Sequence, residues 1–202
     1  MTKFHFTRRC FLIVASLLLF SCVANAGLIL QDTVNQSVQV QFFSLVGQSF
    51  TAEDPFVTFA FYITSMNRFL TPQELTITLY DGSGFSAGIL QSQSFNPGAG
   101  FDGYYAIDFT GSPLTVGNIY SVSLTTTTAY WGLEGAQSDL YAGGTSFLQG
   151  NAGGCCGTPF ADTRFRVTPQ ESPAAPEPAT IGMLSLGAVA LAGFRMLSRR
   201  KR

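Results

Sequence analysis

The sequence predicts an all-β protein: a central antiparallel β-sandwich or jelly roll, with an N-terminal signal peptide and one C-terminal transmembrane helix. Three observations support this prediction. Short runs of alternating apolar and polar residues fill the middle of the 202-residue chain. Clusters of Gly, Pro, Asn, Asp and Ser separate these runs. The long apolar stretches lie near the two ends.

Six segments show the period-two alternation that gives a strand one buried face. They are 38–42, 57–64, 75–80, 105–109, 120–124 and 165–167. Turn clusters are expected at 81–84, 96–98, 111–113 and 116–118. Helix is expected only as a turn at 71–74, because Pro72 suits the start of a helix.

Two stretches do not read as strands. Residues 131–154 are rich in Gly, Ser and Gln and are expected to form a long loop, which in a compact domain is often functional. Residues 169–175 are rich in Pro and Ala and are expected to form a semi-rigid spacer. The predicted β-sandwich ectodomain therefore spans residues 27–168.

The first 26 residues have the three parts of a cleavable secretory signal. Cations before residue 10 are followed by an apolar segment at 10–20 and by Ala24-Asn25-Ala26, which would leave Gly27 as the new N-terminus. General secretion (Sec) is the expected route. Residues 7–12 also resemble a twin-arginine (Tat) signal, and a loose lipobox ending at Cys22 leaves lipidation open as an alternative.

The C-terminal end has three consecutive parts. Pro176-Glu177-Pro178 is followed by an apolar run over 179–197, close to the ~20 residues that a helix needs to cross a bilayer. Residues 198–202 form a basic tail that would stay in the cytoplasm, because Lys and Arg next to a span are retained there. The cations of this stop are Arg199, Arg200, Lys201 and Arg202.

This order of tripeptide, span and basic tail at 176–202 resembles the PEP-CTERM sorting signal of Gram-negative bacteria, a tail also labelled the C-terminal domain of ice-binding proteins. The resemblance implies cleavage near the tripeptide by an exosortase, after export across the inner membrane and transient anchoring. The product would be released or retained at the cell surface. Residues 47–52 and 162–167 also resemble exported bacterial jelly-roll domains that precede such tails.

Residues 27–175 hold eleven acids, three arginines and no lysine, a formal net charge of −8. Nucleic acid is excluded as a partner, because binding it requires Lys and Arg to neutralise phosphates. The charge serves solubility, or it indicates a divalent cation such as calcium, for which Asp81 is the named candidate. No other cofactor or metal is expected.

The residues available for catalysis are few. His5 is the only histidine and would leave with the signal peptide, so Ser-His-Asp and Cys-His mechanisms and His-based zinc sites are excluded from the mature protein. Cys155 and Cys156 are expected to form a vicinal disulfide in an oxidising compartment, with intermolecular bridging as the alternative. A pair of carboxylates in a glycosidase remains a minor alternative to a protein that is not an enzyme.

Tyr130 and Trp131 open the long Gly-rich stretch. Exposed aromatic rings of this kind stack on sugars, so both are candidate glycan-binding residues, but a core position is more common and is favoured for Trp131. The sequence thus predicts a non-catalytic surface protein of an extracellular polysaccharide or biofilm matrix, acting by binding or as structure. A true carbohydrate-binding module and, less favoured, a carbohydrate-active enzyme remain alternatives.

Overall fold

The computed structural model describes residues 27–170, which form fifteen β-strands and no helix. Every strand pair among them is antiparallel. The predicted signal peptide with Ala24 and Ala26, the sorting tripeptide, the span at 179–197 and the basic stop lie outside the described residues. Within 27–170, no helix is long and apolar enough to cross a membrane.

The first sheet has six strands in one continuous order. In spatial order they are β11 (Asn151–Ala152), β10 (Ser146–Leu148), β3 (Val46–Thr51), β8 (Ile119–Thr126), β5 (Leu75–Asp81) and β6 (Ile89–Phe95). β5 pairs with β8 at all seven of its residues and with β6 at six, from Leu75 to Tyr80, so β5 is held on both sides over nearly its whole length.

The second sheet has seven strands arranged around β4 (Val57–Ser65). β4 pairs with β7 (Asp102–Asp108), with β15 (Phe165–Pro169) and, through its last three residues, with β9 (Trp131–Ala136). The remaining strands are β1 (Ile29–Gln31) on β15, and β2 (Gln36–Gln39) and β14 (Asp162–Thr163) on β9. A separate small hairpin joins β12 (Gly154–Cys155) to β13 (Thr158–Pro159).

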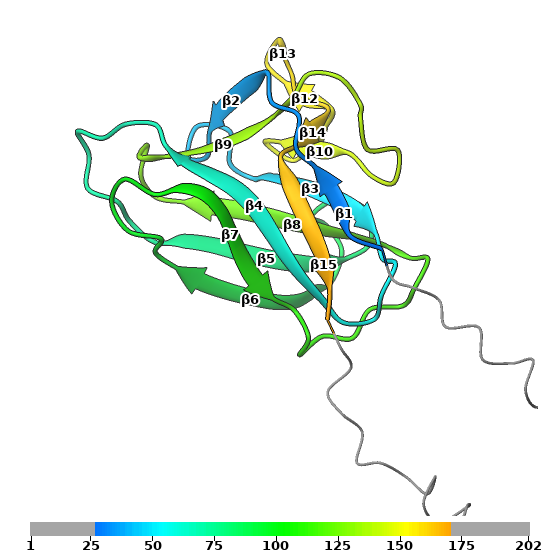
Figure 1. Ribbon diagram of the computed structural model, residues 1–202. Coiled ribbons are helices and arrows are strands. Elements are labelled where there is room, and N and C mark those ends of the chain that lie inside the picture. The colour runs from blue at the N-terminus through cyan, green and yellow to red at the C-terminus, as the bar shows by residue number, and fades with distance from the viewer. Residues whose placement is uncertain (1–26, 171–202) are drawn as a thin grey trace, which may run out of the picture.

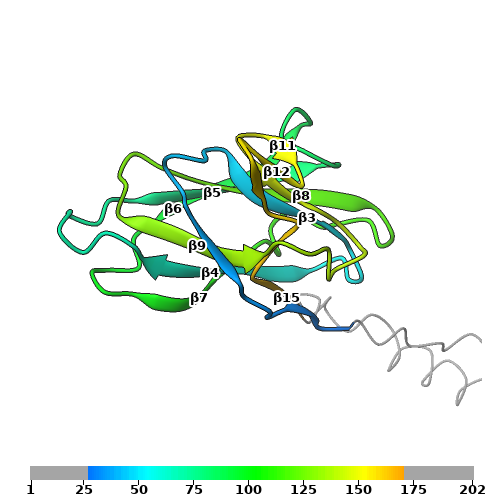
Figure 2. The same cartoon turned by 90° about the horizontal axis from the view of Figure 1, so that it is seen from above.

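The two sheets lie face to face as a β-sandwich, with β4, β7 and β15 in one layer and β5, β6 and β8 in the other (Figures 1 and 2). The alternating side chains of β4 supply the centre of the core: Phe59, Phe61 and Ile63 are fully buried. Phe59 stacks on Phe165 at 5.5 Å between ring centroids and meets Phe50 of the opposite sheet at 5.6 Å. Each such buried side chain stabilises the fold by about 1.5–3 kcal/mol.

The strands expected from alternation are confirmed most fully in β4, β5 and β8. The strand expected at 38–42 is found only in part, because β2 ends at Gln39 and residues 40–43 form a turn that leaves Phe42 exposed. Two expectations are wrong. Residues 131–154 are not one long loop, because they contain β9, β10 and β11, and residues 71–74 form no helical turn. The last strand runs to Pro169, one residue past the predicted end of the ectodomain.

Candidate functional site

Arg164 occupies the place where three strands of the second sheet meet. It lies between β14 and β15, where the chain changes its pairing partner from β9 to β4. Its backbone N–H donates to the carbonyl of Glu134 at 2.7 Å, and its own carbonyl accepts from the N–H of Tyr62 at 2.9 Å. The backbone of Arg164 therefore ties β9 to β4 and aims its side chain at the outer face of the sheet.

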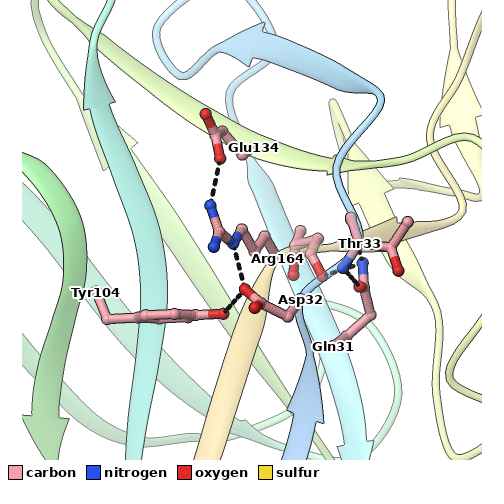
Figure 3. A network of polar contacts seen from close by, with 7 residues as sticks. Gln31, Asp32, Thr33, Tyr104, Glu134 and Arg164 are labelled. Atoms are coloured by element: carbon pink, nitrogen blue, oxygen red, sulfur yellow. Dashed lines mark hydrogen bonds and ion pairs between the residues drawn. The ribbon is translucent and has the colours of Figure 1, made fainter.

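The Arg164 guanidinium is held by two carboxylates, which Figure 3 shows, and by the ring of Tyr62. Nε donates to Asp32 Oδ1 at 2.6 Å, and Nη1 donates to Glu134 Oε2 at 2.9 Å. The guanidinium carbon lies 3.7 Å from the centroid of the Tyr62 ring, within the range of a cation–π contact. Asp32 follows β1, so this side chain also fixes the N-terminal strand.

Tyr104 and Arg166 extend this group across β7 and β15. The Tyr104 hydroxyl donates to Asp32 Oδ1 at 2.8 Å, and its ring meets Tyr62 edge to face at 5.2 Å. The guanidinium carbon of Arg166 lies 4.9 Å from the Tyr104 ring centroid. We call this group the tyrosine–arginine cluster; its members are Asp32, Tyr62, Tyr104, Glu134, Arg164 and Arg166.

The charges of the cluster are mutually adjusted. The hydrogen bond from Arg164, followed by that from Tyr104, lowers the pKa of Asp32 below its usual value. Burial, helped by the bond to Asp32, raises the pKa of Tyr104 to about 12. Burial alone would lower the pKa of Arg164, but its hydrogen bonds to Asp32 and Glu134 outweigh burial and raise that pKa. At neutral pH the cluster is thus ion-paired, and it is suited to positioning strands rather than to moving protons.

A second surface feature is a shallow recess at one end of the first sheet. It has a volume of about 440 Å³ and is lined by Gln73, Glu74, Thr76, Thr125, Thr126 and Thr127. The Thr126 hydroxyl donates to the carbonyl of Glu74 at 3.0 Å, which fixes one wall. The recess thus offers hydroxyls, an amide and a carboxylate, which can hydrogen-bond a polar ligand.

The structure decides between a core position and a sugar-stacking position for Tyr130 and Trp131. Trp131 begins β9 and is fully buried, and its indole Nε1 donates to the carbonyl of Gln73 at 2.8 Å. Tyr130 is also buried, and its hydroxyl accepts from the N–H of Gly100 at 2.8 Å. A sugar can stack only on an exposed ring face, so neither residue is a stacking platform and Trp131 is a core residue.

Cys155 and Cys156 lie in the β12–β13 hairpin, on an open surface hollow. Both are thiols in the structure, with their Sγ atoms 3.0 Å apart. Burial, then the neighbouring Cys156, raises the pKa of Cys155 to about 11, so at neutral pH its thiolate, the nucleophilic form, is disfavoured. The vicinal disulfide stays a prediction.

The calcium candidate, Asp81, is exposed at the end of β5, and its N–H donates to the carbonyl of Gly88 at 2.9 Å. In the described part of the chain, no three His, Cys, Asp or Glu side chains are grouped as metal ligands. Gly27, the predicted new N-terminus, is the first described residue and is exposed.

The sequence did not predict the tyrosine–arginine cluster that Arg164 and Arg166 form. The one indication in the sequence was that Arg164 and Arg166 alternate with the apolar residues Phe165 and Val167, which places both arginines on the polar face of the segment. Their partners Asp32 and Tyr104 lie far away in the chain, and Asp32 is separated from Arg164 by 132 positions.

Comparison with known families finds one match. The family model of the PEP-CTERM protein-sorting motif matches residues 174–201. The chain carries a PEP-CTERM sorting motif. This motif implies an exported, exosortase-sorted protein of the Gram-negative cell envelope. No curated protein and no solved structure is significantly similar to the chain.

Proposed function

We propose that this protein is a non-catalytic component of an extracellular polysaccharide or biofilm matrix, delivered to the cell surface through its PEP-CTERM motif. The observation that carries the proposal is the direct succession of sandwich and motif. β15 ends at Pro169 and the motif match begins at residue 174, so the β-sandwich is the cargo next to the sorting signal. After export through Sec or Tat, the exosortase would act on the chain near Pro176-Glu177-Pro178.

A binding or structural role is supported by the chemistry of the sandwich surface. Arg164 of the tyrosine–arginine cluster is committed to two carboxylates within the fold. No histidine lies between residues 27 and 175, so proton transfer near neutral pH has no histidine to rely on. Ser and Thr side chains dominate the outer face of β5 and β6, where hydroxyl pairs link Thr76 to Ser94 at 3.0 Å and Thr78 to Ser92 at 2.9 Å.

The sorting step is tested by replacing Pro176, Glu177 and Pro178 with alanine in the exporting bacterium. We expect the full-length chain to accumulate in the inner membrane and to be lost from the surface and matrix fractions. Intact-mass analysis of the wild-type surface protein should show loss of the segment from about residue 179 onward. Pro173→Ala is the matched control and should be sorted normally. A surface protein that still carries Arg199–Arg202 would contradict the proposal.

A carbohydrate-binding role is the second candidate, and the recess beside Glu74 favours it. Its volume of about 440 Å³ lies within the range of small-ligand sites, and its lining of hydroxyls with one carboxylate suits a neutral glycan. On a glycan array, the surface protein should bind one class of polysaccharide, and Glu74→Gln should weaken that binding at least tenfold. Glu53→Gln, also on an exposed carboxylate, is the control and should bind normally. Release of shortened glycans would instead support a carbohydrate-active enzyme.

A further inference from the structure

The outer edge of β6 differs from the other free sheet edges in the described residues. β6 ends the six-stranded sheet and pairs only with β5 (Figure 1). Its seven residues, Ile89 to Phe95, contain no charge, proline or glycine. Every second residue of such an edge strand leaves its N–H and C=O without a partner strand, so the edge is a template for another strand.

The remaining free edges carry the features that block strand addition. β7 is equally long but has an aspartate at each end, Asp102 and Asp108. β1, β2, β11 and β14 have only three, four, two and two residues. Short edges and inward or flanking charges are the usual protections against edge-to-edge pairing. Only β6 combines length with neutrality.

β6 itself has one irregularity. A β-bulge opposite Leu79 and Tyr80 leaves Leu90 as an extra residue, and the register is then regular from Gln91 to Phe95. Ser112 donates to the carbonyl of Leu90 at 3.4 Å, so the start of the strand is partly covered. The five residues Gln91–Phe95 are thus the accessible part of the edge.

The segment Gln91–Phe95 can pair antiparallel with the same segment of a second copy of the protein. Two antiparallel copies centred on Gln93 place Gln93 opposite its own copy and Ser92 opposite Ser94 of the other chain. Hydroxyl pairing of this kind already exists on the other side of the strand, where Ser92 and Ser94 meet Thr78 and Thr76. The side chains of Gln91 and Gln93 are held on the other face of the strand, because both donate to the carbonyl of Asp108 on β7 at 3.0 Å.

We propose that β6 is a self-association strand, through which two copies of this protein join their six-stranded sheets antiparallel into one continuous sheet. The pairing buries a small area, so it is weak in dilute solution, and the high local concentration on a cell surface favours it. Because each domain is acidic and no basic residue lies in β6, salt screens the repulsion between copies and strengthens the association.

The test uses the exported protein recovered from the cell surface. Sedimentation velocity over a range of concentrations should show a reversible dimer that increases with salt. Ser94→Lys should weaken dimerisation at least tenfold. Thr76→Lys is the matched control: it loses the same hydroxyl pair and adds the same charge, but it lies one strand inside the edge. Its dimer should persist.

Hydrogen–deuterium exchange identifies the surface that is buried. Amides of 91–95 should become protected as concentration rises, whereas those of the other long edge, 102–108, should not change. A protein that stays monomeric up to millimolar concentration, equal weakening by both lysine variants, or protection at β7 instead of β6 would each overturn the proposal. Correct sorting of a monomeric protein would show that this inference fails while the proposed function stands.

Discussion

Asp162 and Arg164, two residues apart in the chain, are the centres of two polar networks. The networks differ mainly in their exposure to water. Asp162 points between the sheets and is fully buried, whereas Arg164 points outward and keeps a fifth of its side chain exposed. The buried carboxylate accepts from the N–H groups of Leu140 and Tyr141 at 2.6 and 2.9 Å, and from Gln48 Nε2 at 3.2 Å. The inner network therefore links the two sheets and fixes the loop after β9.

The comparison shows where polar interactions determine this fold. A buried group that loses its partner finds no water to replace it, so its loss costs about 1–3 kcal/mol for each unsatisfied donor or acceptor. An exposed ion pair competes with water and contributes about 0–1 kcal/mol. We therefore expect the inner network to dominate stability, although the outer cluster has more charges.

The largest effect is expected for Asp162→Ala. The N–H groups of Leu140 and Tyr141 lose their acceptor, while Gln48 Nε2 keeps only the carbonyl of Ser49 at 3.1 Å. The free energy of unfolding, measured with urea, should fall by about 3 kcal/mol or more. A decrease below 1 kcal/mol would show that water enters the site and would remove the contrast with the surface.

Asp162→Asn separates the contribution of the two backbone hydrogen bonds from that of the bond with Gln48. The asparagine oxygen can still accept from the two backbone N–H groups, but its amide then faces Gln48 Nε2, a second donor. Gln48 cannot turn over, because its Oε1 already accepts from the N–H of Thr163 at 2.9 Å. The asparagine variant should thus lose about 1–2 kcal/mol, less than the alanine variant.

Arg164→Ala is expected to have an intermediate effect. It removes two ion pairs and the contact with Tyr62, and a network of this kind should contribute about 1–2 kcal/mol. Arg164→Lys should recover little of the loss, because one ammonium group cannot reach Asp32, Glu134 and the ring face together. Urea unfolding of both variants checks this prediction. A lysine variant as stable as wild type would show that charge alone matters here.

The contrast also shows which parts of the molecule the sequence could predict. Alternation predicted β4 and β5 because each buries one face along its whole length. It missed β9, because Gly132 and Gly135 resemble loop residues. In the structure, a side chain at either glycine would collide with Met66 or with the backbone of Asp162, so these glycines allow close packing within the sheet.

The two networks themselves could not be predicted, because both depend on strand register. Period-two patterns say which face a residue occupies, but not which residue lies beside it on the next strand. Asp162 meets Gln48 from 114 positions away, and Arg164 meets Asp32 from 132. The burial of Trp131 was open for the same reason, since its partner is the carbonyl of Gln73.

The smallest effect is expected at Asp32, and its pH dependence separates the two networks. Arg164 lowers the pKa of Asp32, so this group adds stability at neutral pH that is lost as pH falls through the folded-state pKa, below 3.8. Burial raises the pKa of Asp162, so the folded state binds that proton more tightly, and its contribution to stability falls as pH rises above 3.8.

Urea unfolding of wild type, Asp32→Asn and Asp162→Asn between pH 3 and 7 tests this difference in sign. At pH 7 Asp32→Asn should cost less than about 1 kcal/mol, because its carboxylate is half exposed. As pH falls, the gap between wild type and Asp32→Asn should shrink, while the gap between wild type and Asp162→Asn should widen. If both gaps shrink together, Asp162 is stabilised mainly as a hydrogen-bonded carboxylate, and its burial does not determine its protonation.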